Sequence, residues 1–155
     1  MEPVAPPALE LVASLEASLG PVVDLGEGAA GRRRIVPILG GCIEGKAFSG
    51  SVLPGGNDVQ LIRGDGVAEI AARYGIALDG GGSLFVENKG VRHGPPETLA
   101  ALARGERVDS SLIYFRTQLR FSTDVATLAW LERDLFVGAG MRLPDGVRID
   151  IYRVA

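Results

Sequence analysis

Apolar and polar residues alternate along several segments of the chain with the period of two that is typical of β-strands. The clearest segment is 147–154, where Val147, Ile149 and Ile151 share one face and polar side chains occupy the other. Three more segments are predicted to be strands, two because they are rich in β-branched and aromatic residues and one because it lies between turn-forming clusters. These segments are 83–88, 111–119 and 69–77.

Glycine is unusually frequent, with 22 of 155 residues, and it gathers with proline and aspartate in turn-forming clusters. Most clusters are separated by roughly 8 to 15 residues, a spacing that an all-β sandwich or barrel produces. The sequence therefore predicts short strands joined by tight turns. The clusters are Gly40-Gly41, Pro54-Gly55-Gly56, Gly64-Asp65-Gly66, Asp79-Gly80-Gly81-Gly82, Gly94-Pro95-Pro96 and Pro144-Asp145-Gly146.

Residues 8–19 fit two patterns at once. Their leucines and alanines alternate with mostly polar residues, as in a strand. Leu11, Leu15 and Leu19 also form a helical stripe, and the Ala/Leu/Glu composition slightly favours a helix.

Two other segments are predicted to be helices. Residues 97–104 follow Pro95-Pro96 and end before Gly105. Residues 123–136 have Ser122 or Thr123 as an N-cap and are followed by a glycine at 138.

Length and charge limit the classes of function. A chain of 155 residues is expected to form one domain, residues 1–155, with a core that needs no metal or disulfide. The net charge is −3 and the 16 Lys and Arg residues are dispersed, so nucleic acid is not expected as a partner. No signal peptide and no run of 18 apolar residues is present, so we expect a cytoplasmic protein without a membrane partner.

Metal ions and cofactors are not expected. The single cysteine, Cys42, and the single histidine, His93, cannot form a cysteine-rich zinc site or a histidine cluster. The chain contains no P-loop, no Rossmann glycine fingerprint, no G-x-S-x-G motif and no H-E-x-x-H motif. Any chemistry would therefore rest on polar side chains of the predicted strands.

Asp58 and Gln60 are the first candidates for such chemistry. They occupy alternate positions directly after a Pro-Gly-Gly turn, so they lie on one pleat face at the start of a strand. Arg73 is a second candidate because its face neighbours Ala71, Gly75 and Ala77 are small and would leave room around a guanidinium pointing into a cavity. Other polar residues on predicted strands are Tyr74, Glu87, Asn88, Tyr114 and Arg116.

Each candidate also has an ordinary structural explanation. A charged residue on an antiparallel strand commonly lies on the solvated face. Asp58 can cap the neighbouring turn. Tyr74, Tyr114 and Trp130 can be core aromatic residues with one satisfied polar atom.

The succession of motifs along the chain resembles the family catalogued as domain of unknown function 3237. The resemblance covers about residues 9–154. One departure is Val59, because the family usually has an aromatic residue, often Trp, at that position. The motifs are GGCIEGKAFSGSVLPGGNDVQL, AARYGIAL, LFVENKGVR, IYFRTQLRFST and AWLERDLFVGAGMR.

The resemblance implies a mainly β fold, a single antiparallel calycin-like or lipocalin-like β-barrel with one or two short helices that close an end. It also assigns residues 9–19 to the first strand, against the helical propensity. The resemblance also implies a homo-oligomer, so a dimer or tetramer is expected. Some members of the family belong to secondary-metabolite pathways. The motif positions carried over are Gly55, Gly56, Asp58, Arg73, Tyr74, Asn88, Gly90, Tyr114, Phe115, Arg116, Trp130 and Leu131.

Together, the residues and the resemblance predict a site inside the barrel. In this hypothesis Asp58 points inward and meets Arg73, with Tyr114 or Tyr74 on the same wall. These groups would act as a cofactor-independent lyase, isomerase or cyclase on a carbonyl-bearing small molecule. Expected ligand-binding residues are Gln60, Tyr74, Asn88, Arg116 and Trp130.

Two alternatives stay open at the level of sequence. The barrel can bind a small molecule without turnover, with the Asp–Arg pair orienting the ligand. It can also be a structural homo-oligomer, with exposed strands forming the interfaces. A barrel interior filled by side chains would exclude both small-molecule hypotheses.

Overall fold

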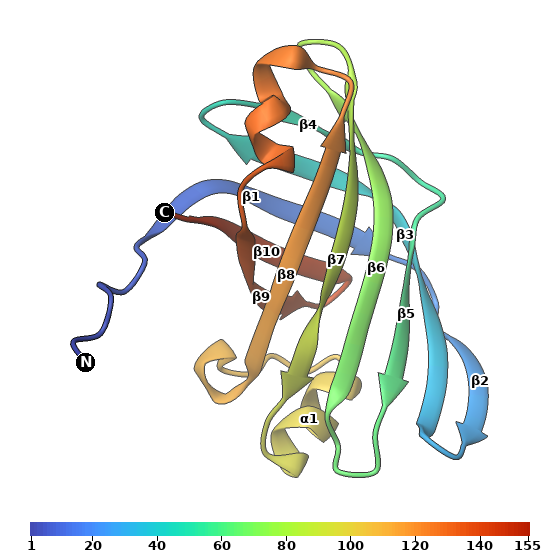
Figure 1. Ribbon diagram of the computed structural model, residues 1–155. Coiled ribbons are helices and arrows are strands. Elements are labelled where there is room, and N and C mark those ends of the chain that lie inside the picture. The colour runs from blue at the N-terminus through green and yellow to red at the C-terminus, as the bar shows by residue number, and fades with distance from the viewer.

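Antiparallel strands form one continuous sheet that curls into a closed eight-stranded barrel in the computed structural model, which describes residues 1–155 (Figure 1). Most strands place successive side chains alternately in the interior and on the outer surface, as the sequence pattern predicts. The strands are β1 (Leu9–Leu19), β2 (Val23–Gly28), β3 (Gly31–Gly45), β4 (Ser49–Val52), β5 (Asn57–Ile62), β6 (Ala68–Leu78), β7 (Ser83–His93), β8 (Tyr114–Thr123), β9 (Phe136–Leu143) and β10 (Gly146–Val154).

The long strand β3 closes the barrel. Along one edge it pairs first with β2 and then with β1, and along the other first with β5 and then with β4. Both β4 and β5 also pair with β6, so together they fill one position in the barrel. From β6 the sheet continues through β7, β8, β9 and β10 back to β1.

The helices lie at opposite ends of the barrel (Figure 1). The α-helix α1 (Pro96–Ala103) lies at one end, followed by the 3₁₀ turn η1 (Ser110–Leu112). The 3₁₀ helix η2 (Ala126–Glu132) lies at the other end, where it buries Leu128 and Leu131. The α1 end is therefore the open end, and the η2 end is capped by apolar side chains.

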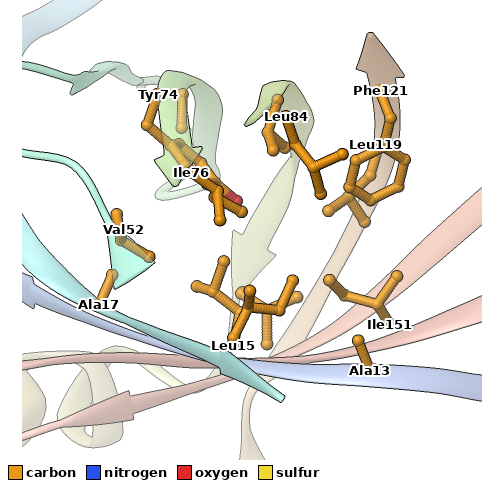
Figure 2. Packing of buried hydrophobic residues seen from close by; sticks show 14 of the residues in the cluster. Ala13, Leu15, Ala17, Val52, Tyr74, Ile76, Leu84, Leu119, Phe121 and Ile151 are labelled. Atoms are coloured by element: carbon orange, nitrogen blue, oxygen red, sulfur yellow. The ribbon is translucent and has the colours of Figure 1, made fainter. Parts of the chain in front are cut away.

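A core of 23 buried residues fills most of the barrel, and Figure 2 shows part of it between the strands. Ile76, Val86 and Phe136 are among the side chains with no exposed surface. At the η2 end the Phe136 ring packs edge-on against Phe121, with centroids 5.1 Å apart. Dense apolar packing here leaves free space only toward α1.

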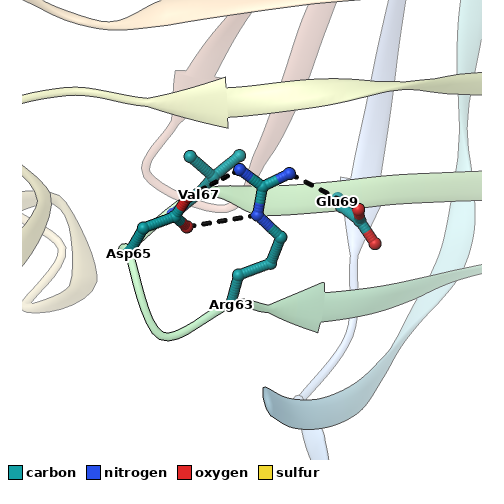
Figure 3. Close-up of polar contacts among 4 residues, drawn as sticks. All are labelled: Arg63, Asp65, Val67 and Glu69. Atoms are coloured by element: carbon teal, nitrogen blue, oxygen red, sulfur yellow. Dashed lines mark hydrogen bonds and ion pairs between the residues drawn. The ribbon is translucent and has the colours of Figure 1, made fainter. Parts of the chain in front are cut away.

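The hairpin between β5 and β6 carries a small polar network at the open end (Figure 3). The guanidinium of Arg63 donates to both carboxylate oxygens of Asp65, over 3.1 and 2.6 Å, and Asp65 also accepts from the backbone N–H of Val67 over 3.1 Å. A third contact joins Arg63 to Glu69 over 3.6 Å. Because these groups are exposed, the network orders the turn and adds little stability.

The observed elements confirm most of the predicted strands and one predicted helix. The strand predicted over 111–119 begins only at Tyr114, because Ser110–Leu112 form η1. Residues 9–19 form β1, so burial on one face of the sheet outweighs helical propensity, and residues 97–104 coincide with α1 apart from one residue at each end. The helix predicted over 123–136 is confirmed only at its centre, as the 3₁₀ helix η2 over Ala126–Glu132. Thr123 still belongs to β8, where its hydroxyl donates to the carbonyl of Ser83, and only the short η2 follows before β9 begins at Phe136.

The seam between β1 and β3 depends on Gly41. Its φ is +135°, and a Cβ there would collide with the backbone of Glu16 on β1. We expect Gly41→Ala to lower the free energy of unfolding by about 2 kcal/mol, because both the strain and the clash act on the seam that closes the barrel.

The neighbouring Gly40→Ala variant is the matched control. Its Cβ would meet only the carbonyl oxygen of Val52, at an ordinary 3.7 Å. Urea unfolding of both variants measures the difference, and equal stability would contradict this role of Gly41.

Candidate functional site

Space inside the barrel remains at the α1 end. A small cavity of about 40 Å³, here called the narrow cavity, lies there beside a wider hollow of about 590 Å³, here called the mouth, and both are lined by Leu19, Arg92 and Arg142. The narrow cavity is mostly apolar but contains several polar side chains on one wall. They are Asp58, Gln60, Tyr74, Asn88, Arg92 and Arg142.

Asp58 is held in place on β5 by a hydrogen bond to each carboxylate oxygen. Oδ1 accepts from the backbone N–H of Ala71 over 3.0 Å, and Oδ2 accepts from the Gln60 side chain over 2.5 Å. Gln60 is 2 % exposed and accepts in turn from Nε of Arg34 over 2.8 Å. The chain of bonds from Arg34 through Gln60 orients the carboxylate.

A local opening of the sheet makes the bond to Ala71 possible. Asp58 pairs with Ala72, and the next β5 residue paired with β6 is Leu61. Between them the Asp58 side chain takes up the N–H of Ala71. The carboxylate is thereby fixed between two strands and faces the cavity.

Burial raises the pKa of the Asp58 carboxyl above its ordinary value of 3.8. The hydrogen bonds from Gln60 and Ala71 and the charges of Arg92 and Arg34 oppose this effect without cancelling it. A carboxylate with a raised pKa is a better proton acceptor than a surface aspartate.

Three arginines surround this carboxylate. Arg92 is only 8 % exposed, and burial together with the like charges of Arg142 and Arg34 lowers its pKa to about 10. Burial also lowers the pKa of Arg34 and of Arg142. The site therefore holds more positive than negative charge at neutral pH.

Glycines on β9 shape the wall beside these arginines. A Cβ at Gly140 would collide with the ring of Phe115, so the glycine lets this ring lie against the strand. The guanidinium of Arg92 lies over the same ring, 5.7 Å from its centroid. The aromatic face supports Arg92 at the boundary between the narrow cavity and the mouth.

Two further side chains complete the polar wall. Burial and the charge of Asp58 raise the pKa of Tyr74, so this phenol stays neutral and can donate a hydrogen bond. Asn88 is 4 % exposed, and its Oδ1 has no hydrogen-bond partner. A buried polar atom without a partner is costly, so it is a group that a ligand or water can satisfy.

The residues predicted from sequence divide into two groups. Asp58, Gln60, Tyr74 and Asn88 line the narrow cavity together. Arg73, Tyr114 and Arg116 lie on the outer surface, and Trp130 packs at the opposite end of the barrel.

The predicted contact between Asp58 and Arg73 is wrong. Arg73 points outward from β6, its side chain is 65 % exposed, and it forms an ion pair with Glu87 over 3.2 Å. The small residues on its face belong to the outer surface, whereas Ala72 and Tyr74 face the interior. The arginines that act on Asp58 are Arg34 and Arg92 instead.

Tyr114 and Arg116 also lie away from the cavity, contrary to the prediction. Tyr114 is 48 % exposed and stacks on His93 with ring centroids 4.8 Å apart. Arg116 lies over the same tyrosine ring, 5.6 Å from its centroid. Their interior neighbour on β8 is Phe115, which does line the cavity.

Trp130 belongs to η2 and packs against the core rather than a ligand site. Its ring lies 5.8 Å from that of Phe136, and the guanidinium of Arg153 covers it at 5.9 Å. The indole therefore helps to cap the η2 end of the barrel.

Sequence reasoning missed Arg34, Arg92 and Arg142. Arg34 shares a strand face with the apolar Val36 and Ile38, and this alternation could have distinguished it from its exposed neighbours Arg32 and Arg33. Arg92 follows Leu84, Val86 and Asn88 on one face of β7 in the same way. On β9 the glycines between Phe136 and Arg142 hide the pattern.

No group of three or more His, Cys, Asp or Glu side chains is gathered as a metal site. None of the helices could span a lipid bilayer. The chemistry that this arrangement offers is proton transfer by a carboxylate, with guanidinium and phenol groups beside it to stabilise negative charge.

The fold and the cavity define a closed antiparallel β-barrel with a polar pocket at one end. The chain belongs to the family described as "Protein of unknown function (DUF3237)", whose model matches residues 7–154.

Relatives in several bacteria share both sequence and fold. The UPF0311 protein RPA1785 of Rhodopseudomonas palustris is 46 % identical over 96 % of this chain and 98 % of its own, and its crystal structure superposes with a TM-score of 0.92 over the whole of both chains. A β-barrel-like protein from Acinetobacter baumannii is 38 % identical, with a TM-score of 0.86 over the whole of both chains.

A more distant structure shares the fold alone. It is described as an enzyme from Penicillium herquei and is 19 % identical, with a TM-score of 0.78 over 100 % of this chain and 99 % of its own.

The raised pKa of Asp58 predicts a specific dependence of stability on pH. Between 3.8 and the raised value, the unfolded chain has released this proton while the folded protein retains it, so the contribution of Asp58 is complete below 3.8 and is lost as the pH rises through its folded pKa. We expect the stability of the wild type relative to Asp58→Asn to fall as the pH rises through that window.

Urea unfolding of both proteins at a series of pH values measures this difference. The lost hydrogen bond in Asp58→Asn adds an offset that does not vary with pH, so the slope alone reports the carboxyl. A difference that stays constant or grows with pH would contradict the burial of an ionisable Asp58.

Proposed function

We propose that the protein is a cofactor-independent enzyme that moves a proton on a carbonyl-bearing small molecule, as a lyase, an isomerase or a cyclase. The observation that carries the proposal is Asp58, the one carboxylate that lines the narrow cavity, oriented by two hydrogen bonds and surrounded by cationic groups.

Asp58 would act as the base. Each of its carboxylate oxygens already accepts one hydrogen bond and has lone-pair capacity for another group. A C–H bond beside the substrate carbonyl would break, its proton would pass to Asp58, and the electron pair would form an enolate. Because the raised pKa of Asp58 lies closer to the pKa of the substrate C–H group, the transfer of the proton to the carboxylate costs less free energy.

Positive and neutral donors would stabilise the enolate oxygen. Arg92 and Arg142 line the cavity as cations, and Tyr74 lines it as a neutral phenol. Donors fixed in position before the reaction need little reorganisation when the charge develops. The enolate would then take this proton back from Asp58 at another carbon, expel a leaving group that takes the proton, or attack a second carbonyl whose oxygen takes the proton, which gives the isomerase, lyase and cyclase outcomes.

The size of the cavity supports a small reacting group. A volume of about 40 Å³ accommodates about three water molecules. Only the carbonyl and its neighbouring carbon would enter this space, while the rest of the substrate occupied the mouth. The enzyme from Penicillium herquei provides an example of catalysis described for a barrel of this fold.

A binding barrel without turnover is the second candidate. The observation that favours it is that both carboxylate oxygens of Asp58 already accept a hydrogen bond, since such an aspartate can serve to hold Gln60 and β6 in place. In that case the same cavity would bind a ligand, and Asp58 would remove no proton from it.

Exchange of α-protons for deuterium tests the proposal without knowledge of the natural substrate. The protein is incubated in D₂O with a panel of ketones, 2-oxo acids and 1,3-dicarbonyl compounds, and loss of the α-proton signal is followed by NMR. We expect at least one class to exchange faster than in buffer, and Asp58→Asn to reduce that acceleration by about 100-fold or more.

Glu87→Gln is the matched control, because Glu87 lies on the outer surface in its pair with Arg73. This variant should keep the wild-type exchange rate. An acceleration that survives in Asp58→Asn would exclude Asp58 as the base, and a bound carbonyl compound with no acceleration would favour the binding barrel.

A further inference from the structure

The arginines at the open end combine burial with the lack of an ion pair. Six arginines on the surface form ion pairs with carboxylates within 4.0 Å: Arg32, Arg63, Arg73, Arg104, Arg148 and Arg153. Five further arginines without an ion pair are exposed: Arg33, Arg107, Arg116, Arg120 and Arg133. Arg34, Arg92 and Arg142 also form none, but Arg34 and Arg142 are half-buried and Arg92 is buried. The open end therefore holds buried guanidinium groups without an ion-pair partner, and a buried charge costs more free energy than an exposed one when it is not paired.

Arg92 is the most buried of the three. It is 8 % exposed and lines the narrow cavity, and its Nε has no hydrogen-bond partner. Its pKa is lowered to about 10, because burial and two like charges outweigh the attraction of Asp58. A negatively charged ligand would relieve both the missing bond and the repulsion.

Arg92 and Arg142 lie where the two spaces meet, because both line the narrow cavity and the mouth. A guanidinium offers parallel N–H donors that match the two oxygens of a carboxylate. The guanidinium of Arg92 lies over the ring of Phe115, 5.7 Å from its centroid, so the ring bounds it on one side. An anionic group at this boundary would leave its neighbouring carbon atoms beside Asp58.

The mouth indicates the rest of the ligand. It is a hollow of about 590 Å³ in which half of the lining residues are apolar, among them Leu99 and Leu102 of α1 and Leu19 of β1, and Arg34 and Asp145 also line its wall. Such a surface suits an apolar body larger than the narrow cavity can accept.

We infer that the substrate is a small organic carboxylate that also carries the reacting carbonyl, with its carboxylate held by Arg92 and Arg142 and its apolar body in the mouth. The inference names the substrate class for the proposed function and rests on it for the reaction. The binding of the carboxylate can be tested independently of turnover.

Phenylpyruvate and its uncharged methyl ester are suitable probes, since they share one carbon skeleton and differ in the anionic group. Acetate, pyruvate and benzoate extend the series to smaller carboxylates. Binding at millimolar concentration is followed by chemical shift changes in the ¹H–¹⁵N spectrum, which also reports whether each variant is folded.

We expect phenylpyruvate to bind the wild type at least tenfold more tightly than its ester, with shifts at β7 and β9. Arg92→Gln and Arg142→Gln should each reduce this preference at least fivefold. Arg73→Gln, on the outer surface, should keep it within twofold. If Arg92→Gln does not fold, Arg142→Gln and the comparison of acid with ester in the wild type still decide the matter.

The inference is overturned if the ester binds as tightly as the acid, if no carboxylate of the series binds, or if the preference survives in both cavity variants. Asp58→Asn separates this result from the proposed function. It should keep or strengthen carboxylate binding, because it removes a like charge, while it abolishes proton exchange. If carboxylates bind but proton exchange is equally fast in Asp58→Asn and the wild type, the proposed function is rejected and the substrate class is not. If the protein accelerates exchange only for uncharged carbonyl compounds and this acceleration requires Asp58, the substrate class is rejected and the proposed function is not.

Discussion

The pairing of β1 with β3 closes the barrel, and the rest of the structure depends on this closure. A closed sheet has one interior, so the period of two along each strand assigns every side chain either to that interior or to the surface. At the η2 end the interior is filled by apolar side chains, including Phe121, Phe136 and Leu131. At the α1 end the same alternation brings polar groups from β3, β5, β7 and β9 into one unfilled space.

The polar end is an arrangement that folding alone does not favour. Burial opposes ionisation of Asp58, and it also opposes the charge of Arg92, which has no ion-pair partner. The hydrogen bonds that Asp58 receives from Gln60 and Ala71 offset only part of this cost. Proteins retain such groups where function uses them, and a proton-transfer site that binds an anion would use both the desolvated carboxylate and the uncompensated arginines.

Most of the fold could be predicted from sequence, and about half of the site. Alternation and turn clusters define most of the strands. Of the predicted site residues, Asp58, Gln60, Tyr74 and Asn88 do line the cavity. Arg73 was misassigned because alanine and glycine dominate its face, while the more apolar Ile70 and Ile76 on the other face mark the true interior. Arg142 could not be found because Gly138 and Gly140, needed for the packing of Phe115 and Thr117, remove the apolar signal from β9. Which arginine acts on Asp58 depends on strand pairing, which local sequence does not determine.

The most direct test of this account is a ¹³C NMR titration of the Asp58 side-chain carboxyl in the wild type, Arg92→Gln and Arg73→Gln. The account predicts a pKa above the ordinary 3.8 in the wild type. It predicts a further rise in Arg92→Gln, because that cation favours the carboxylate, and no change in Arg73→Gln. An ordinary pKa, or one that responds to Arg73 and not to Arg92, would contradict a secluded Asp58 within a cluster of cavity arginines.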